Sequence, residues 1–281
     1  MQVEQVTDPI AYHAEGPVWW PGWGGLRWVD MLAGDVLSLR PDGSIGRRTV
    51  GTIAACVRPR TGGGAVIGVE RGFALEDPDG TLQVLPPVFL DAGVRMNEGD
   101  CDPHGRFWCG SMAADRSPSA TLYRLDPDRT VTPVLTGVTV SNGLSWTPDG
   151  DRAFYNDTAT QQVAVFDVDA DRGLTHRRVF AEIAESDGHP DGLTVDAQGG
   201  VWVALYGGGA VHHYLPGGTL ADVIELPVSK VTACTFGGEH LDELFITTSR
   251  EDLPDDAEPL AGSVFRARPG VTGQPARTFA G

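Results

Sequence analysis

Four segments of this sequence place a polar or acidic side chain next to a glycine, at the head of a short apolar strand pattern. A glycine-containing turn follows each segment after a short apolar stretch. Hard cations bind carboxylate and amide oxygens, and a cyclic repeat fold would bring equivalent positions of successive repeats together. The pattern therefore predicts a metal held on the axis of a repeat protein. The four segments are Glu15-Gly16-Pro17, Asn97-Glu98-Gly99, Asn142-Gly143-Leu144 and Asp191-Gly192-Leu193.

These dipeptides have an alternative interpretation, because Asn-Gly and Asp-Gly are also frequent in hairpin turns. Pro-Asp-Gly occurs at residues 41–43, 78–80 and 148–150 without implying any chemistry. Pro190-Asp191-Gly192 differs, since another turn at residues 196–199 follows it closely. Two turns that flank a four-residue strand favour the inner strand of a repeat over an outer hairpin.

A repeated unit positions these side chains. A glycine turn followed by a strand with a large apolar centre recurs with glycines at positions 25, 64, 105, 150 and 200, spaced by 39, 41, 45 and 50 residues. A sixth, degenerate copy covers residues 240–246. This period is typical of propeller blades, whereas a β-sandwich would not need six similar units. The sequence predicts an all-β, six-bladed β-propeller, with residues 1–281 as a single domain and at most one helical turn, at residues 180–186.

In a propeller, the innermost strand of each blade lines the central channel. The four polar segments precede the turn that opens the second strand, so we expect their side chains on inner strands around one axial point. The equivalent positions in the other two blades are residues 54–56 and 232–234, which are small and mostly apolar and would leave room for a bound molecule. The four axial side chains are Glu15, Asn97, Asn142 and Asp191.

The composition limits the partners of the protein. The formal net charge is −17 and no basic patch is visible, which argues against nucleic acid or an anionic membrane as a partner. The four cysteines lack metal-binding spacing and are interpreted as small buried residues of a reduced protein. Neither a signal-peptide pattern nor an apolar run long enough for a membrane helix is visible. We expect a cytoplasmic protein, monomeric or weakly homo-oligomeric.

Other candidate motifs do not fit their context. Gly207-Gly208-Gly209 follows a strand pattern but opens no helix, so it does not resemble a phosphate loop. His212 and His213 are adjacent on a strand and face opposite sides, which favours surface or packing roles over a shared metal. The sequence contains no His-Glu-x-x-His and no Gly-x-Ser-x-Gly pattern, so no constellation for serine or cysteine catalysis is visible.

A set of longer motifs covers nearly the whole chain. It consists of residues 14–19, 95–99, 102–112, 141–146, 190–193, 201–204, 234–238, 261–265 and 279–281. Each motif alone has low specificity, but together they resemble the senescence-marker-protein/gluconolactonase family, which includes regucalcin and bacterial sugar lactonases. The resemblance implies a six-bladed propeller with one divalent cation on its axis, and hydrolysis of sugar lactones.

The resemblance assigns three oxygen ligands to the metal, namely Glu15, Asn142 and Asp191. Two of them are anionic, and open positions are left for water and the lactone oxygen, as a catalytic site requires. A divalent cation polarises the carbonyl and lowers the pKa of bound water. Asp191 is the candidate general base, a weak base that acts by position because the metal bond lowers its pKa. Oxygen ligands leave Ca, Zn, Mn, Mg and Fe(II) as alternatives.

The resemblance also implies a substrate site. The family's substrate-contacting residues fall on Arg95 and Asn97. Arg95 would hold sugar hydroxyls or the ring oxygen through its fork of donors, and Asn97 can both donate and accept. Glu98, where the family often has the shorter aspartate, is assigned to the same site, and a further family carboxylate aligns near Asp115. The alternative role of Arg95 is a surface salt bridge.

These residues favour a divalent-metal-dependent hydrolase that converts a sugar (aldono-)lactone to the aldonic acid. A non-enzymatic calcium-binding or ligand-binding propeller is one alternative, because one fold hosts many functions. A hydrolase of a non-sugar lactone or ester is another. Arg95, Asn97 and Glu98 beside the metal ligands favour the enzyme, since a binding module would close its site with protein ligands.

Overall fold

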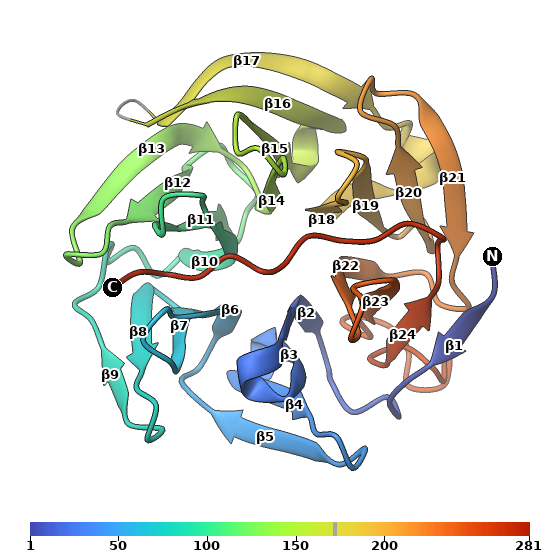
Figure 1. The fold of residues 1–281 in the computed structure, drawn as a ribbon, viewed down its shortest axis with the longest axis horizontal. Helices are drawn as coiled ribbons and strands as arrows, with labels where there is room; N and C mark the ends of the chain where they lie inside the picture. Colours follow the sequence, from blue (N-terminus) through green and yellow to red (C-terminus); the bar gives the residue numbers. More distant parts are fainter. Residues whose placement is uncertain (171–172) are drawn as a thin grey trace.

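Six four-stranded antiparallel sheets form a ring in the computed structural model, which describes residues 1–170 and 173–281 (Figure 1). The innermost strands contact one another around the centre of the ring. The predicted all-β, six-bladed β-propeller is therefore confirmed. Within the described residues, no helix is long and apolar enough to cross a membrane.

The blades follow one another along the chain, and the strands of each blade are named from the channel outward. The first contains β2 (Ala14–Trp20), β3 (Gly25–Asp30), β4 (Asp35–Leu39) and β5 (Ile45–Thr49), and the second β6 (Ala54–Pro59), β7 (Ala65–Val69), β8 (Gly72–Glu76) and β9 (Leu82–Val84). The third contains β10 (Val94–Cys101), β11 (Phe107–Ala113), β12 (Ala120–Leu125) and β13 (Val131–Val138), and the fourth β14 (Ser141–Trp146), β15 (Arg152–Asp157), β16 (Gln162–Asp169) and β17 (Gly173–Glu182). The fifth contains β18 (His189–Val195), β19 (Val201–Tyr206), β20 (Ala210–Tyr214) and β21 (Leu220–Glu225), and the sixth β22 (Val231–Gly237), β23 (Glu243–Thr248), β24 (Val264–Ala267) and β1 (Val3–Gln5). Short 3-10 turns are η1 (Pro21–Trp23), η2 (Met31–Ala33), η3 (Thr158–Thr160) and η4 (Glu185–Asp187).

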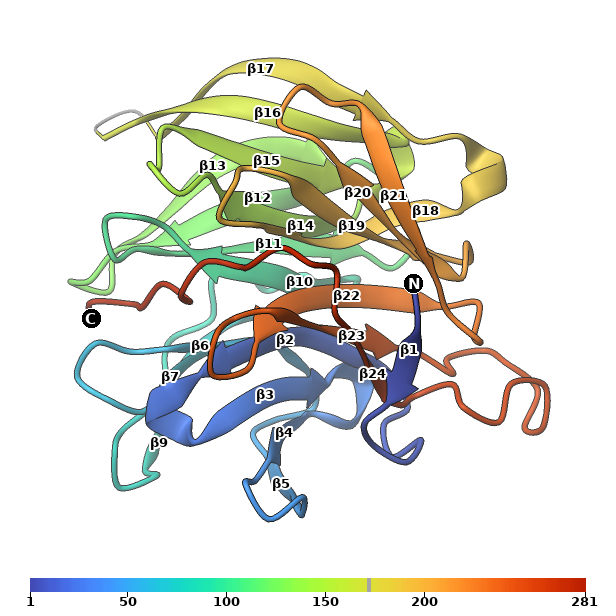
Figure 2. The same cartoon turned by 45° about the vertical axis from the view of Figure 1, so that its right-hand side comes forward.

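The sixth blade is completed by the first strand of the chain. β1 pairs antiparallel with β24, with Val3 opposite Ala267, so the first and last strands of the chain share one sheet (Figure 2). The glycine-turn repeat does not include β1, and this closure was therefore not predicted from the sequence. Closure of the ring by β1 supports our proposal that residues 1–281 are one domain.

The large apolar residues at the centre of the predicted repeats fill the spaces between blades. Trp28, Trp108 and Trp202 lie on the second strands of three blades and are at most 1% exposed. Burial of an aromatic side chain of this size contributes about 4 to 6 kcal/mol of transfer free energy. The recurring apolar strand after each glycine turn is thus the main element that holds the blades together.

In each of two blades, an aspartate connects the turn after the inner strand to the tryptophan of the second strand. In blade five, Asp196 accepts two backbone N–H groups of its own turn at 2.9 and 2.8 Å and the Trp202 indole N–H at 3.0 Å. Blade three repeats this arrangement, with Trp108 Nε1 donating to Asp102 at 2.8 Å. Because each carboxylate satisfies several buried donors at once, we assign these two aspartates a structural role.

Replacement of Asp196 by alanine should lower the free energy of unfolding by about 3 kcal/mol, because buried donors lose their acceptor. Urea denaturation would measure this loss. The matched control is Asp42→Ala, which removes an exposed turn aspartate that accepts the Ser44 N–H at 2.9 Å and should cost less than about 1 kcal/mol. A similar small loss in both variants would argue against the structural role of Asp196.

The predicted helical turn was placed too early in the sequence. Residues 180–182 belong to β17, and the 3-10 turn η4 begins only at Glu185. The reason is tertiary packing, because the Phe180 ring contacts the Phe154 ring edge-on with centroids 4.6 Å apart and so belongs to the sheet. Local composition alone does not reveal such a contact.

The histidine pair and the cysteines behave as the sequence indicated. His212 and His213 are both buried on β20, where His213 stacks on Trp202 with ring centroids 3.9 Å apart. His212 Nδ1 lies 3.1 Å from the Tyr214 hydroxyl. The packing role predicted for the two histidines is confirmed. All four cysteines are buried and none forms a disulfide.

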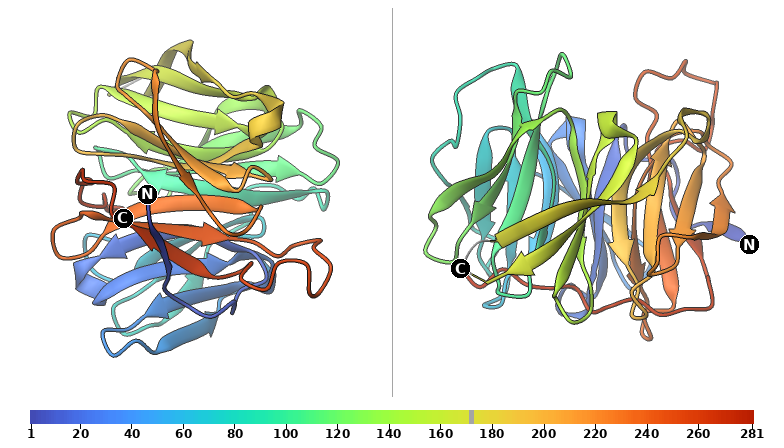
Figure 3. Two further views of the ribbon diagram at one scale, coloured as in Figure 1. Left: turned by 90° about the vertical axis from the view of Figure 1, so that its right-hand side faces the viewer. Right: turned by 90° about the horizontal axis from the view of Figure 1, so that it is seen from above.

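The C-terminal residues 268–281 form a strap that crosses one end of the central channel (Figure 1; Figure 3, right). Gln274 Nε2 donates to the carbonyls of Trp146 at 3.1 Å and Val195 at 3.0 Å, and Phe279 is fully buried. The loop between β23 and β24 stands at the opposite end of the ring (Figure 3, right). The strap covers one end, so we take the opposite end as the mouth of the channel.

Candidate metal and active site

Every inner strand contains a one-residue β-bulge at an equivalent position. A bulge places two residues opposite one and re-aims the side chains at that point. Asn97, Asn142 and Asp191 lie in such bulges, and Glu15 is the last paired residue before the bulge of its strand. The pairing shifts lie between Glu15 and Val18 in β2, Met96 and Gly99 in β10, Ser141 and Leu144 in β14, and Pro190 and Leu193 in β18, with matching shifts in β6 and β22.

The glycines beside the polar residues are required by the close approach of neighbouring inner strands. A Cβ atom on Gly143 would lie 2.7 Å from the Asp191 carbonyl oxygen, and one on Gly192 would lie 2.4 Å from the Ala233 Cβ. No larger residue fits at these two positions without displacing backbone. The polar-glycine pairs therefore mark the points where the inner strands converge, rather than hairpin turns.

Glu15 and Asp191 bring two carboxylates together in the channel. Their side chains belong to residues that are 2% and 5% exposed. Glu15 Oε2 accepts the Gly16 N–H at 2.8 Å, whereas Asp191 Oδ1 has no hydrogen-bond partner among the described residues. Burial raises the pKa of Glu15 to about 7. Burial, and then the charges of Glu15 and Glu98, holds the pKa of Asp191 well above its usual range. The two carboxyl groups therefore hold their protons more firmly than exposed ones do, and a bound cation would favour their ionised forms.

A chain of hydrogen bonds orients the amides of Asn142 and Asn97. Thr158 Oγ1 donates to the Pro190 carbonyl at 2.9 Å, so its oxygen accepts from Asn142 Nδ2 at 2.6 Å. This fixes Asn142 Oδ1 as an acceptor, and Asn97 Nδ2 donates to it at 2.8 Å. Arg95 Nη1 in turn donates to Asn97 Oδ1 at 2.7 Å. This series of hydrogen bonds thus holds Asn142 Oδ1 in one orientation. The oxygen has a second lone pair that can accept another partner.

The oxygens of Glu15, Asn142 and Asp191 fit a hard divalent cation. No three His, Cys, Asp or Glu side chains form a ligand cluster in the part of the chain that the structure describes, and the predicted set takes its third oxygen from an amide. Asn oxygens are ordinary ligands of Ca²⁺, and carboxylates suit Ca²⁺, Mg²⁺ and Mn²⁺. The unpartnered Asp191 Oδ1 supports the fit, because a buried carboxylate oxygen without a donor is costly.

Glu98 faces a different space from Arg95. It lines a cavity on the strap side of the channel, together with Arg58, Gln274 and other residues. Glu98 Oε2 lacks a hydrogen-bond partner among the described residues, and burial, followed by the charge of Glu15, raises the pKa of Glu98 well above its usual range. The structure therefore brings Glu98 close to the carboxylate pair, and its contact with a substrate stays a prediction.

Asp115 lies in the exposed loop after β11. Its carboxylate accepts the Ser117 backbone N–H at 2.9 Å, which is a local turn contact. This geometry gives no support for a role of Asp115 at the axial site.

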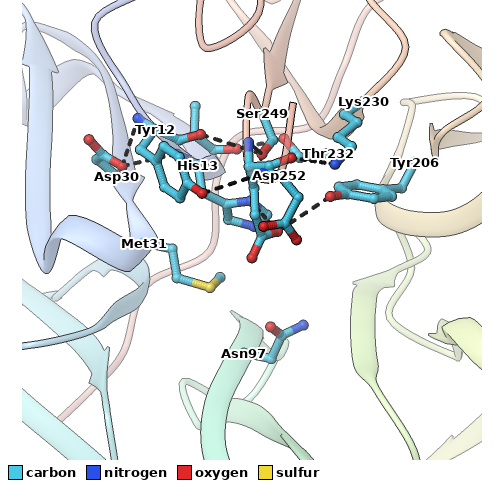
Figure 4. A network of polar contacts seen from close by, with 12 residues as sticks. Tyr12, His13, Asp30, Met31, Asn97, Tyr206, Lys230, Thr232, Ser249 and Asp252 are labelled. Carbon is cyan, nitrogen blue, oxygen red and sulfur yellow. Dashed lines mark hydrogen bonds and ion pairs between the residues drawn. The ribbon is translucent and has the colours of Figure 1, made fainter. Parts of the chain in front are cut away.

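A second polar group, at the mouth of the channel, was not predicted from the sequence. Both Tyr206 Oη and His13 Nδ1 lie 3.3 Å from Glu251 Oε2. Lys230 donates to the Glu251 carbonyl, and its Nζ lies 5.2 Å from the centre of the Tyr206 ring. Figure 4 shows this group, with Asn97 below His13 and Tyr206. These residues come from loops and strand ends that carry no repeated glycine signal, so no pattern in one sequence pointed to them.

The metal-free protein should lose stability as the pH rises from about 4.5 to about 7. The folded state holds the Glu15 proton more tightly than the unfolded state, because the pKa rises from 4.5 to about 7 on folding. The loss should be on the order of 3 kcal/mol at pH 8. A bound divalent cation would favour the ionised carboxylate and so remove this loss.

Urea unfolding at pH 5 and pH 8, after chelation and with Ca²⁺ added back, would test this prediction. Other carboxylates change stability with pH as well, so the comparison has to be made with Glu15→Gln, which cannot titrate at this position. The wild type should lose about 2.5 kcal/mol more than the variant between the two pH values. An equal loss in both proteins would show that Glu15 does not titrate as described.

Comparison with known proteins places this geometry in a family context. Residues 13–250 match the model of the SMP-30/Gluconolactonase/LRE-like region. The chain is 34% identical over 284 residues to the pentonolactonase XacC of Haloferax volcanii, covering 98% of this chain and 97% of that protein. It is 35% identical over 275 residues to a 6-deoxy-6-sulfogluconolactonase of Pseudomonas putida, covering 95% and 94%. The crystal structure of regucalcin from Agrobacterium tumefaciens, described as a calcium-binding protein, superposes with a TM-score of 0.92 at 25% identity, covering 99% and 97%.

Proposed function

We propose that this chain, which belongs to the SMP-30/gluconolactonase/LRE-like family, is a divalent-metal-dependent enzyme that hydrolyses a sugar (aldono-)lactone to the aldonic acid. The observation that carries the proposal is the contact between the two buried carboxyls of Glu15 and Asp191. A neighbouring inner strand holds the Asn142 amide in one orientation, bonded to the Arg95–Asn97 pair. The names of the two lactonases similar to this chain support lactone hydrolysis as its chemistry. Its cytoplasmic location and its monomeric or weakly oligomeric state stay predictions.

Glu15, Asn142 and Asp191 would hold the cation, and Asp191 would also serve as general base. When bound, a divalent cation polarises the lactone carbonyl and acidifies a water molecule. Asp191 has a buried oxygen without a protein donor, which suits it to accept the proton of the attacking water. Water oxygen bonds to the carbonyl carbon, the ring C–O bond breaks, and the ring oxygen takes up the proton as a hydroxyl group. The product is the open-chain acid.

Arg95 and Asn97 would orient the substrate. Arg95 Nη1 is committed to Asn97 Oδ1, to the Met96 carbonyl and to the Met31 sulfur, which fixes the guanidinium plane. Among the described residues, no hydrogen bond to Arg95 Nη2 is found, which leaves a donor for a sugar hydroxyl or ring oxygen. A fixed donor of this kind contributes to the rate by positioning the substrate.

The test is a panel of five- and six-carbon aldonolactones, assayed by acid release after chelation and after each divalent metal is added back. We expect hydrolysis of at least one lactone, its loss on chelation and its recovery with metal. A protein that binds the metal but hydrolyses no lactone or ester in the panel would instead be a calcium-binding or ligand-binding propeller. Activity on non-hydroxylated lactones or esters alone would favour a non-sugar substrate.

A further inference from the structure

The mouth of the channel contains a carboxylate that the proposed chemistry does not use. Glu251 belongs to the loop between β23 and β24, and its side chain is 28% exposed. Lys230 donates to the backbone carbonyl of Glu251, and the backbone N–H of Glu251 donates to Ser249 Oγ at 3.0 Å. The loop therefore holds the Glu251 backbone from both sides, although its side chain is open to solvent.

Tyr206 donates to one oxygen of this carboxylate, and the imidazole of His13 lies beside the same oxygen with its Nδ1 hydrogen-bonded to Ser249 Oγ at 2.8 Å. Tyr206 Oη and His13 Nδ1 each lie 3.3 Å from Glu251 Oε2. Burial lowers the pKa of His13 to about 3, so the imidazole is neutral and does not form an ion pair with the carboxylate. Burial, and then the Glu251 charge, raises the pKa of Tyr206, which keeps its hydroxyl protonated as a donor. The Tyr206 hydroxyl thus gives the Glu251 carboxylate a defined orientation.

The other oxygen of Glu251 faces no protein donor. No hydrogen bond to Oε1 is found in residues 1–170 and 173–281, and no ion pair joins Glu251 to Arg95 within 4.0 Å. The charge of Glu251 nevertheless acts on the pKa values of both Arg95 and Asp191, so this carboxylate lies near the axial site. Printed contacts aside, the two groups are linked, because Arg95 Nη1 lies 3.0 Å from the Met31 sulfur and the Met31 N–H donates to the carbonyl of His13 at 2.9 Å. Figure 4 shows Met31 and Asn97 on the same side of His13. Glu251 Oε1 is thus an acceptor, and Arg95 Nη2 a donor, without a hydrogen-bond partner among the described residues.

A hydroxyl group matches both the free acceptor of Glu251 and the free donor of Arg95. It can donate to Glu251 Oε1 and accept from Arg95 Nη2 at the same time. A lactone carbonyl, an alkyl chain or a carboxylate cannot do both, and a second carboxylate would be repelled by Glu251. A site built to hydrogen-bond a substrate hydroxyl rejects an analogue that lacks it, because its polar groups are left unpaired.

We infer that Glu251 is a specificity-determining residue that accepts a hydrogen bond from a substrate hydroxyl opposite Arg95, and so selects polyhydroxylated lactones over unsubstituted ones. The inference rests on the proposed lactonase function. It assigns Glu251 to recognition of the sugar portion and gives it no part in breaking the lactone bond. The same geometry predicts binding of a cyclic polyol that has no lactone bond.

The test compares D-glucono-1,5-lactone with δ-valerolactone, which has the same six-membered lactone ring without hydroxyls. In Glu251→Ala, kcat/KM for gluconolactone should fall by about 10- to 100-fold, the scale of a lost charge-assisted hydrogen bond. For δ-valerolactone it should change by less than about twofold. The gluconolactone preference should therefore collapse. A merely structural role of Glu251 would lower both values together, and that result, or an unchanged preference, would overturn the inference.

The matched control is Asp256→Ala, which removes an exposed carboxylate from the same loop and should leave both substrates unaffected. Glu251→Gln keeps an acceptor oxygen and should recover part of the preference lost in Glu251→Ala. Circular dichroism and urea unfolding of each variant would show that the fold is intact.

A binding measurement separates failure of this inference from failure of the proposed function. The probe is 1,5-anhydroglucitol, which has the ring hydroxyls of gluconolactone but no ester to hydrolyse. The metal-loaded wild type should bind it, and Glu251→Ala should bind it at least about 10-fold more weakly. If the wild type hydrolyses no lactone but shows this difference, the catalytic proposal fails and the polyol site stands. If binding is absent, or equal in both proteins, the inference about Glu251 is wrong whatever the activity.

Discussion

Asp191→Asn should hydrolyse the lactone at least about 100-fold more slowly than the wild type when both are saturated with metal, the usual scale for loss of a general base. Asparagine keeps nearly the same shape and one oxygen ligand, but it has no negative charge and accepts no proton at neutral pH. The Asp191 carbonyl accepts the Asn156 side-chain amide at 2.7 Å, a contact that the substitution leaves in place. The backbone position of residue 191 should therefore be preserved.

Metal occupancy has to be measured independently, because the variant should also bind the cation more weakly. Glu15 and Asn142 are left as ligands, so high metal concentrations should still load the site. Near-normal turnover by a fully loaded Asp191→Asn protein would mean that the base lies elsewhere. Glu98 would then be the next candidate, since it is buried, shifts the pKa of Asp191 through its charge and has an oxygen without a described partner.

The propeller could be predicted from the sequence because each blade repeats one local signal. The glycine turn and the apolar strand after it mark the second strand of every blade, and the polar-glycine pairs mark the bulges of four inner strands. Both signals are local consequences of geometry that every blade has to satisfy. The pairing of β1 was not predicted, because ring closure joins residues 3–5 to residues 265–267. No local sequence pattern indicates a pairing between segments so far apart.

The site was predictable to the extent that it belongs to the repeat. Asn97 and Asn142 occupy equivalent bulges, and the structure joins them through a hydrogen bond of 2.8 Å. Tyr206, His13 and Glu251 meet only because three separate loops and strand ends reach the same mouth. Their contact depends on the tertiary structure, so no local pattern in a single sequence predicts it.

Glu15→Ala should lose the axial cation. Glu15 is one of only two anionic groups in the proposed ligand set, and its removal leaves one carboxylate and one amide oxygen. Removal of a partner that only orients a ligand costs about 10- to 100-fold in metal affinity, so loss of a direct ligand should cost more than about 100-fold. Elemental analysis after gel filtration should find no stoichiometric metal, and lactone hydrolysis should be undetectable. Asp115→Ala is the matched control, because it removes an exposed carboxylate and should retain full occupancy.

Stability distinguishes loss of the metal from a damaged fold in this variant. Burial raises the pKa of Glu15 to about 7, so in the metal-free protein the ionised side chain opposes folding at pH 8. The metal-free Glu15→Ala protein should therefore be at least as stable at pH 8 as the metal-free wild type, despite the small cavity it creates. The wild type alone should gain stability when the cation is added, because only it binds the cation in the folded state. A Glu15→Ala protein that keeps a stoichiometric cation, or gains as much stability from it as the wild type, would exclude Glu15 as a ligand.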